Sequence, residues 1–177
     1  MTRWIISTAK SAKTMKTKLY EFDPVVYPFP LIVCKYISKV TAKEISERYN
    51  GVMSRTQMAT FDEDELRGYP TLTAKTLCVV DKKTEFMKYM VILYRPKKIR
   101  YGVIAHEDLH VVTLLCDWLG IRPPQQSDDE PHAYLIQWVA NCIGSVLDGR
   151  PEVMKGKLLN QDKNESEKTE SNAGGQE

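Results

Sequence analysis

The feature that most constrains the fold is a run from Ile104 to Leu119 that would be apolar on most sides of a helix. At about 100° per residue, its polar residues fall mainly in one narrow stripe, and apolar residues cover most of the remaining surface. The stripe consists of His106, His110, Thr113 and Asp117. A helix that is apolar on most sides is normally buried. The sequence therefore predicts a buried helix over 104–119, carrying two buried histidines and ended by Gly120.

The two histidines of this run have the spacing of ligands for one metal ion. Residues i and i+4 lie one above the other on a helix, so His106 and His110 can reach the same Zn²⁺. Glu107 completes the pattern His-Glu-x-x-His, in which the glutamate can take a proton from metal-bound water. The alternative is a helix that keeps this pattern without binding metal.

A second helix is expected after a short polar linker. It opens near Pro131, a residue type suited to the first helical turn, and should run to about Asp148, with Gly149 behind it. One face of this helix is polar and the other apolar, as in an amphipathic helix. The polar face carries Glu130, Tyr134, Gln137 and Asn141.

A catalytic zinc ion needs a third protein ligand and an open position for water. Glu130 is the first candidate for that ligand, and Asp128 and His132 are the alternatives. His132 points away from Glu130 on the helix, so we expect a packed or surface histidine there more often than a ligand. Tyr134, one turn after Glu130, is a candidate hydrogen-bond donor to a developing oxyanion.

His106-Glu107-x-x-His110, followed by Glu130-x-x-Ala133 at the start of a second helix, resembles the small gluzincin-type metallopeptidases, most of all the ImmA/IrrE-like minimal ones. The resemblance covers about Leu77 to Asp148. It implies an α+β, minimal zincin-like domain, in which a small mixed or antiparallel sheet precedes the motif helix and a second helix carries the glutamate. It further implies that His106, His110 and Glu130 bind Zn²⁺, that Glu107 is the general base and that the substrate is a peptide or protein.

Composition is consistent with one domain. With 42% hydrophobic residues in 177, the chain can bury one core, which we expect within residues 19–150. Residues 1–18 form a basic segment without acids, and residues 155–177 form a polar tail that we expect to be disordered. The net charge of +2 gives no case for a nucleic-acid partner, and no apolar run approaches the roughly 20 residues of a membrane span. We therefore expect a cytoplasmic protein.

The first half of the chain is predicted to form strands and one helix. Val25–Val33, interrupted by prolines, predicts an edge strand or an irregular extended segment. Thr41–Tyr49 predicts a helix capped by Thr41 with Glu44. Thr76–Val80 and Phe86–Leu93 predict a hairpin, whose second strand precedes the motif helix and would suit a peptide-binding edge.

Four scattered cysteines predict buried, reduced thiols rather than disulfides or a thiolate zinc site. They are Cys34, Cys78, Cys116 and Cys142. The alternative to a peptidase is a zinc-stabilised or metal-free protein-binding module, of the kind that a phage or mobile element encodes. A closed, fully protein-coordinated metal site would favour the zinc-stabilised form of that alternative.

Overall fold

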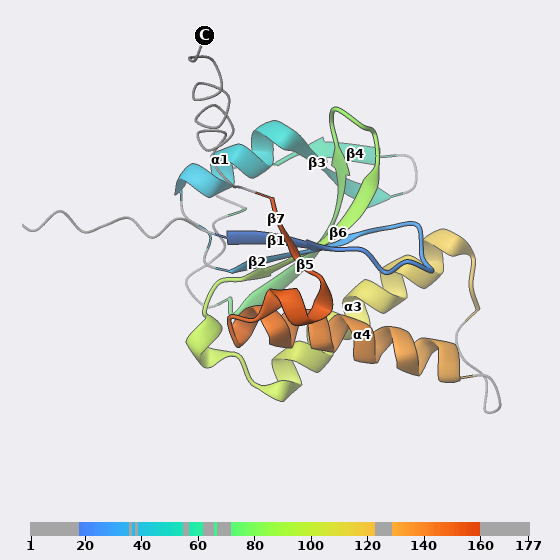
Figure 1. Ribbon diagram of the computed structural model, residues 1–177. Helices are drawn as coiled ribbons and strands as arrows, with labels where there is room; N and C mark the ends of the chain where they lie inside the picture. The colour runs from blue at the N-terminus through green and yellow to red at the C-terminus, as the bar shows by residue number, and fades with distance from the viewer. Residues whose placement is uncertain are drawn as a thin grey trace, which may run out of the picture.

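The computed structural model describes residues 18–35, 37, 39–54, 57–61, 66, 72–122 and 129–159. In this part of the chain a mixed sheet lies between one helix on one face and two long helices on the other, so the predicted α+β class is confirmed (Figure 1). The strands are β1 (Lys18–Phe22), β2 (Leu31–Lys35), β3 (Tyr49–Ser54), β4 (Gln57–Thr60), β5 (Ala74–Asp81), β6 (Met87–Leu93) and β7 (Lys157–Leu158). The helices are α1 (Lys39–Arg48), α3 (Tyr101–Leu119) and α4 (Glu130–Leu147), with 3₁₀ turns at Pro96–Lys98 and Pro151–Met154.

The strands follow the order β4-β3-β5-β6-β2-β1-β7. Strands β2 and β6 pair in parallel, and the other described neighbours are antiparallel. The predicted hairpin is confirmed as β5 and β6, which pair from Ala74 with Leu93 to Val80 with Met87. Strand β6 nevertheless lies between β5 and β2, so our expectation that it forms a peptide-binding edge is wrong. Its seven residues are all buried, because helices cover both faces of the sheet there.

Two further local predictions need correction. Of the two alternatives for Val25–Val33, residues 25–30 are irregular as one of them states, and the edge strand is wrong: β2 begins at Leu31, after the three prolines, and pairs with β1 and β6 on its two sides. Val25 and Val26 lie in that loop and are exposed. Helix α1 begins at Lys39, so Thr41 lies inside its first turn, buried, and is not the residue before the helix that a capping box requires.

The alternation of side chains along the strands divides the core between the two faces of the sheet. On β6, Tyr89 and Val91 point to the α3 and α4 side, and Met90 and Ile92 point to the α1 side. The larger cluster is the one under α3 and α4. The four cysteines are all buried and free, as the sequence predicts, and burial raises the pKa of the Cys34 thiol to about 12.

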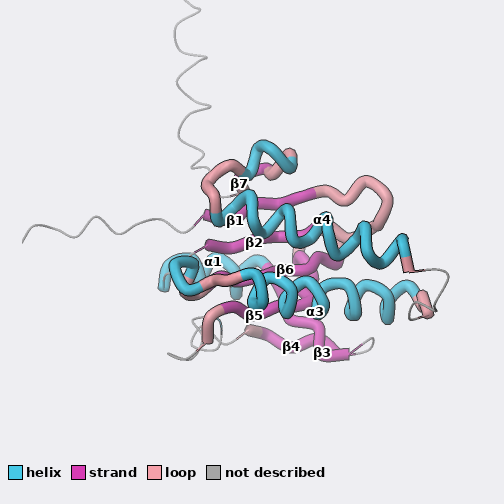
Figure 2. The backbone as a smooth tube through the Cα atoms, turned by 90° about the horizontal axis from the view of Figure 1, so that it is seen from below, coloured by secondary structure: helices cyan, strands magenta, loops and turns pink. Residues whose placement is uncertain are grey.

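Helices α3 and α4 lie side by side and antiparallel on one face of the sheet, in front of the strands in Figure 2. Gly120 ends α3 in the left-handed conformation at φ +66°, where a glycine costs least, as predicted. At the other end of the pair, the ammonium group of Lys35 on β2 donates to the last carbonyl groups of α4, on Val146 and Leu147, at 3.2 and 3.0 Å. A cation at this position complements the negative end of the helix and ties α4 to the sheet.

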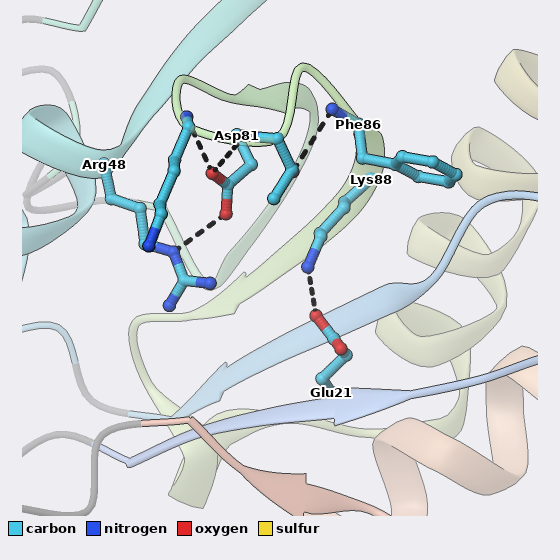
Figure 3. A network of polar contacts seen from close by, with 7 residues as sticks. Glu21, Arg48, Asp81, Phe86 and Lys88 are labelled. Carbon is cyan, nitrogen blue, oxygen red and sulfur yellow. Dashed lines mark hydrogen bonds and ion pairs between the residues drawn. The ribbon is translucent and has the colours of Figure 1, made fainter.

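Charged side chains gather on the α1 side of the sheet (Figure 3). Arg48, the last residue of α1, donates from Nε to the carboxylate of the buried Asp81 at 2.9 Å. Lys88 on β6 forms an ion pair with Glu21 on β1. These contacts join three strands and a helix, and the buried carboxylate of Asp81 depends most on its partner, since the Arg48 side chain remains 46% exposed.

Residues 157–159, which the sequence assigned to the polar tail, take part in the sheet. We placed the start of the polar tail at residue 155, but Lys157 and Leu158 form β7 against β1, and the backbone N–H of Leu159 donates to the carbonyl of Leu19. Most of the tail, and most of the basic N-terminal segment, lie outside the described residues. Among the described helices, none has the length and apolar character needed to cross a membrane.

Candidate metal centre

His106 and His110 lie one turn apart on α3 and turn the same ring nitrogen toward each other. Their Nε2 atoms are 3.1 Å apart, and the two rings meet nearly edge to face at 87°. Two nitrogens bound to one tetrahedral zinc ion, each at about 2.0–2.1 Å, would be roughly 3.3 Å apart. The pair therefore presents two nitrogen donors at close to the separation that one metal ion needs.

The surroundings of this pair differ from our expectation. Both histidines are exposed, whereas Glu107 and Asp108 retain only 4% and 2% of their accessible surface. Our prediction of buried histidines is wrong because α3 faces the sheet through the side that carries Glu107 and Val111 and faces α4 through the side of Asp108 and Val112. The histidine stripe is turned away from both contacts, so it is open to solvent.

Glu107 is anchored to the sheet next to the first histidine. The hydroxyl of Thr76, which lies on the helix-facing side of β5, donates to Glu107 Oε2 at 2.6 Å. A short hydrogen bond to a buried carboxylate fixes the position of the side chain. Thr76 is the supporting residue that the sequence reasoning missed. The alternation of β5 places its even-numbered residues toward α3, but nothing in the sequence indicates which of them meets Glu107.

The structure does not bring Glu130 and Tyr134 to the histidines. Both side chains are exposed at the start of α4 and line an open groove of about 430 Å³ together with Tyr27 and Trp138. Helix α4 passes α3 with His132 next to Cys116, which is six residues, or about 9 Å of helix axis, beyond His110. Glu130 precedes His132 and is thus at the far end of α3 from the metal-binding motif.

His132 is half-buried, and its Nε2 atom lies 3.4 Å from Cys116 Sγ. Burial raises the pKa of the Cys116 thiol, so the neutral thiol is favoured as the hydrogen-bonding partner of the imidazole. This placement agrees with the packed histidine that we expected at this position. Asp128, the other alternative ligand, lies outside the described residues. Among the residues that the structure does describe, no three histidine, cysteine or acidic side chains come close enough together to hold a metal ion.

Asp108 occupies the side of α3 opposite the histidines. Burial, and secondarily the nearby charge of Glu107, raise the pKa of its carboxyl to about 7. Its Oδ1 atom is buried without a hydrogen-bond partner in the described part of the chain. The sequence marks Asp108 only as a break in the apolar surface of the helix.

The described residues thus offer a metal ion two imidazole nitrogens, with an anchored glutamate next to them in the sequence. Further positions around such an ion would be available to water or to a ligand from elsewhere. Comparison of the chain with protein-family models, with curated protein sequences and with solved structures finds no match in any of the three.

Proposed function

We propose that this protein is a zinc-dependent metallopeptidase of minimal zincin-like architecture that hydrolyses a peptide bond. The observation that carries the proposal is the 3.1 Å separation of the Nε2 atoms of His106 and His110 on an exposed face of α3. Two neutral imidazoles in this arrangement suit Zn²⁺. When bound at such a pair, a zinc ion lowers the pKa of a water ligand to about 7 and polarises a carbonyl group.

In this proposal Glu107 is the general base. Thr76 occupies Oε2, so the group cannot rotate freely and Oε1 is left as the oxygen that would accept the proton; since only 4% of the residue is accessible, this step requires the side chain to become more exposed when substrate binds. A general base has to be within hydrogen-bond reach of the proton that it removes, although catalytic contacts often tighten only in the substrate complex. Because the proposal depends on Glu107 as the base, substitution of Glu107 is the most informative test of catalysis.

Glu130 is proposed as the third ligand and Tyr134 as the oxyanion donor. Since both line the groove with Tyr27 and Trp138, the first turn of α4 has to approach the histidine face before Glu130 can bind the same ion. The segment that connects α3 to α4, residues 123–128, lies outside the described residues. If α4 moves in this way, zinc binding should change the environment of Trp138, which lines the same groove as Glu130.

A second candidate is a protein-binding module without catalytic activity. It is favoured by the finding that the described residues assemble no group of three metal ligands. It is also favoured by the engagement of Glu107 with Thr76 inside the protein, since a buried hydrogen-bonded glutamate can have a purely structural role.

A measurement of zinc content distinguishes the metallopeptidase from a metal-free protein-binding module. The protein is purified, incubated with Zn²⁺, dialysed and measured by mass spectrometry, beside His106→Ala, His110→Ala and the control Thr113→Ala, an exposed residue of the same stripe. We expect about one zinc per chain in the wild type and the control, and a zinc content after dialysis that is about tenfold lower in either histidine variant. Absence of zinc from the wild type would leave the metal-free module as the explanation.

Catalysis is tested on a mixture of unstructured peptides followed by mass spectrometry. Glu107→Gln should keep zinc and lose hydrolysis, because glutamine cannot act as a base. Hydrolysis that persists in this variant would refute the assigned mechanism. Glu130→Gln should weaken zinc binding; unchanged zinc binding without any hydrolysis by the wild type would support the zinc-stabilised binding module.

A further inference from the structure

A groove between α3 and α4 lies on the side of α3 that faces away from the histidines. It has a volume of about 750 Å³ and is open to solvent. Its walls come from the first half of α3, from α4 between Ile136 and its end, and from the segment that follows α4 up to Met154. Because a helix turns about 200° over two residues, Asp108 and His106 point in nearly opposite directions, and the groove is separate from the candidate metal centre.

Most of the groove is apolar, and part of its apolar rim is exposed. Tyr101 and Val153 retain 91% and 67% of their accessible surface, and Ile104 and Ile136 extend the apolar wall. Its size is within the usual range for pockets that bind small molecules or single side chains. Exposed apolar residues around a concave surface are typical of a binding site.

One buried carboxyl group in this groove lacks a partner. Asp108 lines the groove with 2% of its surface accessible, and its Oδ1 has no hydrogen-bond partner among the described residues. A buried carboxyl oxygen without a hydrogen bond is unfavourable in the ionised and in the protonated state alike, because it remains an acceptor in both. Two other polar residues of the lining have partners: Ser145 donates to the carbonyl of Cys142, and Arg150, a cation in the same lining, pairs with Asp148 at 3.5 Å.

The charge around Asp108 favours a cation over a neutral donor. Its neighbour Glu107 is also a buried acid, and none of the ion pairs found among the described residues includes either carboxyl group. A positively charged donor forms a stronger hydrogen bond to a carboxylate than a neutral one does. An apolar stem behind the charge would match the apolar walls.

We propose that this groove binds an ammonium or guanidinium group carried on an apolar stem, with the cation donating to the Asp108 carboxylate after a rotation of that side chain brings Oδ1, which is buried in the free protein, to the groove. The same chemistry is supplied by a free alkylamine and by a lysine or arginine side chain of a polypeptide. Gly144 on α4 lines the groove and has open space where a Cβ atom would lie. A larger side chain there can therefore occupy the groove while Asp108 itself is unchanged.

The test compares three probes on the full-length protein without added metal, by isothermal titration and by methyl NMR of Ile104 and Ile136. The probes are n-hexylamine, its neutral analogue n-hexanol, and Nα-acetyl-lysine N-methylamide. We expect hexylamine to bind at least about tenfold more tightly than hexanol, because only the amine can form the charged hydrogen bond. Tighter binding of the lysine derivative than of hexylamine assigns the site to a polypeptide side chain, and the reverse assigns it to a free amine.

Two variants and one control make the test specific. Asp108→Asn should reduce amine affinity by about tenfold, to the level of the alcohol, whereas Asp148→Asn at the exposed rim should change it by less than about threefold. Gly144→Leu should abolish binding of all three probes and serves as the second variant if Asp108→Asn fails to fold. Equal affinity for amine and alcohol, or amine binding that persists in Gly144→Leu, would overturn the proposal. Neither result depends on zinc or on hydrolysis.

Discussion

The hydrogen bond between Thr76 and Glu107 joins the sheet to the helix that carries the candidate metal centre, and its removal gives a measurable prediction. Thr76→Val keeps the shape of the side chain and deletes the hydroxyl that donates to Glu107 Oε2 at 2.6 Å. Valine is at least as favourable in a strand as threonine, so strand propensity predicts no loss of stability. Any destabilisation then comes from the carboxylate that loses its partner.

The magnitude follows from the burial and the charge of Glu107. With 4% of its surface accessible, this carboxylate cannot recover a full hydrogen bond from water. A hydrogen bond to a charged group contributes about 1.5–3 kcal/mol. We expect Thr76→Val to lower the free energy of unfolding by about that amount, which corresponds to a fall of roughly 1 M in the urea midpoint for a domain of this size.

The assay is urea unfolding followed by tryptophan fluorescence, at neutral pH and without added metal. The matched control is Thr113→Val, at an exposed threonine on α3, the helix that carries Glu107. It should change the free energy of unfolding by no more than about 0.5 kcal/mol. The double variant Thr76→Val, Glu107→Leu should cost less than the two single variants added together, because no carboxylate is then left unpaired. A cost for Thr76→Val that equals the control would refute this account of how Glu107 is held.

Two further predictions concern the α1 side of the sheet and the end of α3. Burial opposes ionisation of Asp81, but hydrogen bonds from Arg48 and from the backbone of Lys83 and Thr84 outweigh it and hold its pKa below the ordinary value. The ionised carboxylate therefore contributes stability above the unfolded-state pKa of about 4, and this contribution is lost as pH falls through the folded-state pKa. Urea unfolding between about pH 5 and pH 3 should show a steeper loss for the wild type than for Asp81→Asn, and parallel curves would contradict this. Gly120→Ala, at φ +66°, should lower the unfolding free energy by about 1–2 kcal/mol, whereas a thermal midpoint equal to that of the wild type would show that the left-handed cap carries no strain.

Several features were predictable because short-range signals determine them. The hairpin of β5 and β6, the end of α3 at Gly120 and the start of α4 at Glu130 followed from residue periodicity, glycine and proline, although α3 begins at Tyr101, three residues before the predicted start. The spacing of His106 and His110 likewise placed their rings together, since i and i+4 residues are neighbours on any helix. Hydrophobicity alone predicted the burial of the four cysteines.

What only the tertiary structure decided is the direction in which each element faces. Helical periodicity determines the angles between side chains on α3, but not which of its faces meets the sheet. Most of that surface is apolar, so several orientations appear equivalent in the sequence. The contacts with β5 and α4 turned Glu107 and Asp108 inward and left the two histidines outside.

The same reason explains the position of Glu130 and the internal position of β2. Both depend on packing between segments that are distant in the chain: α4 against the loop before β2, and β2 against β6. The sequence by itself determined the local elements and the donor pair on one helical turn. The surroundings of that pair, and the lack of a hydrogen-bond partner for the Asp108 carboxyl oxygen Oδ1, depend on contacts between segments that are far apart in the sequence.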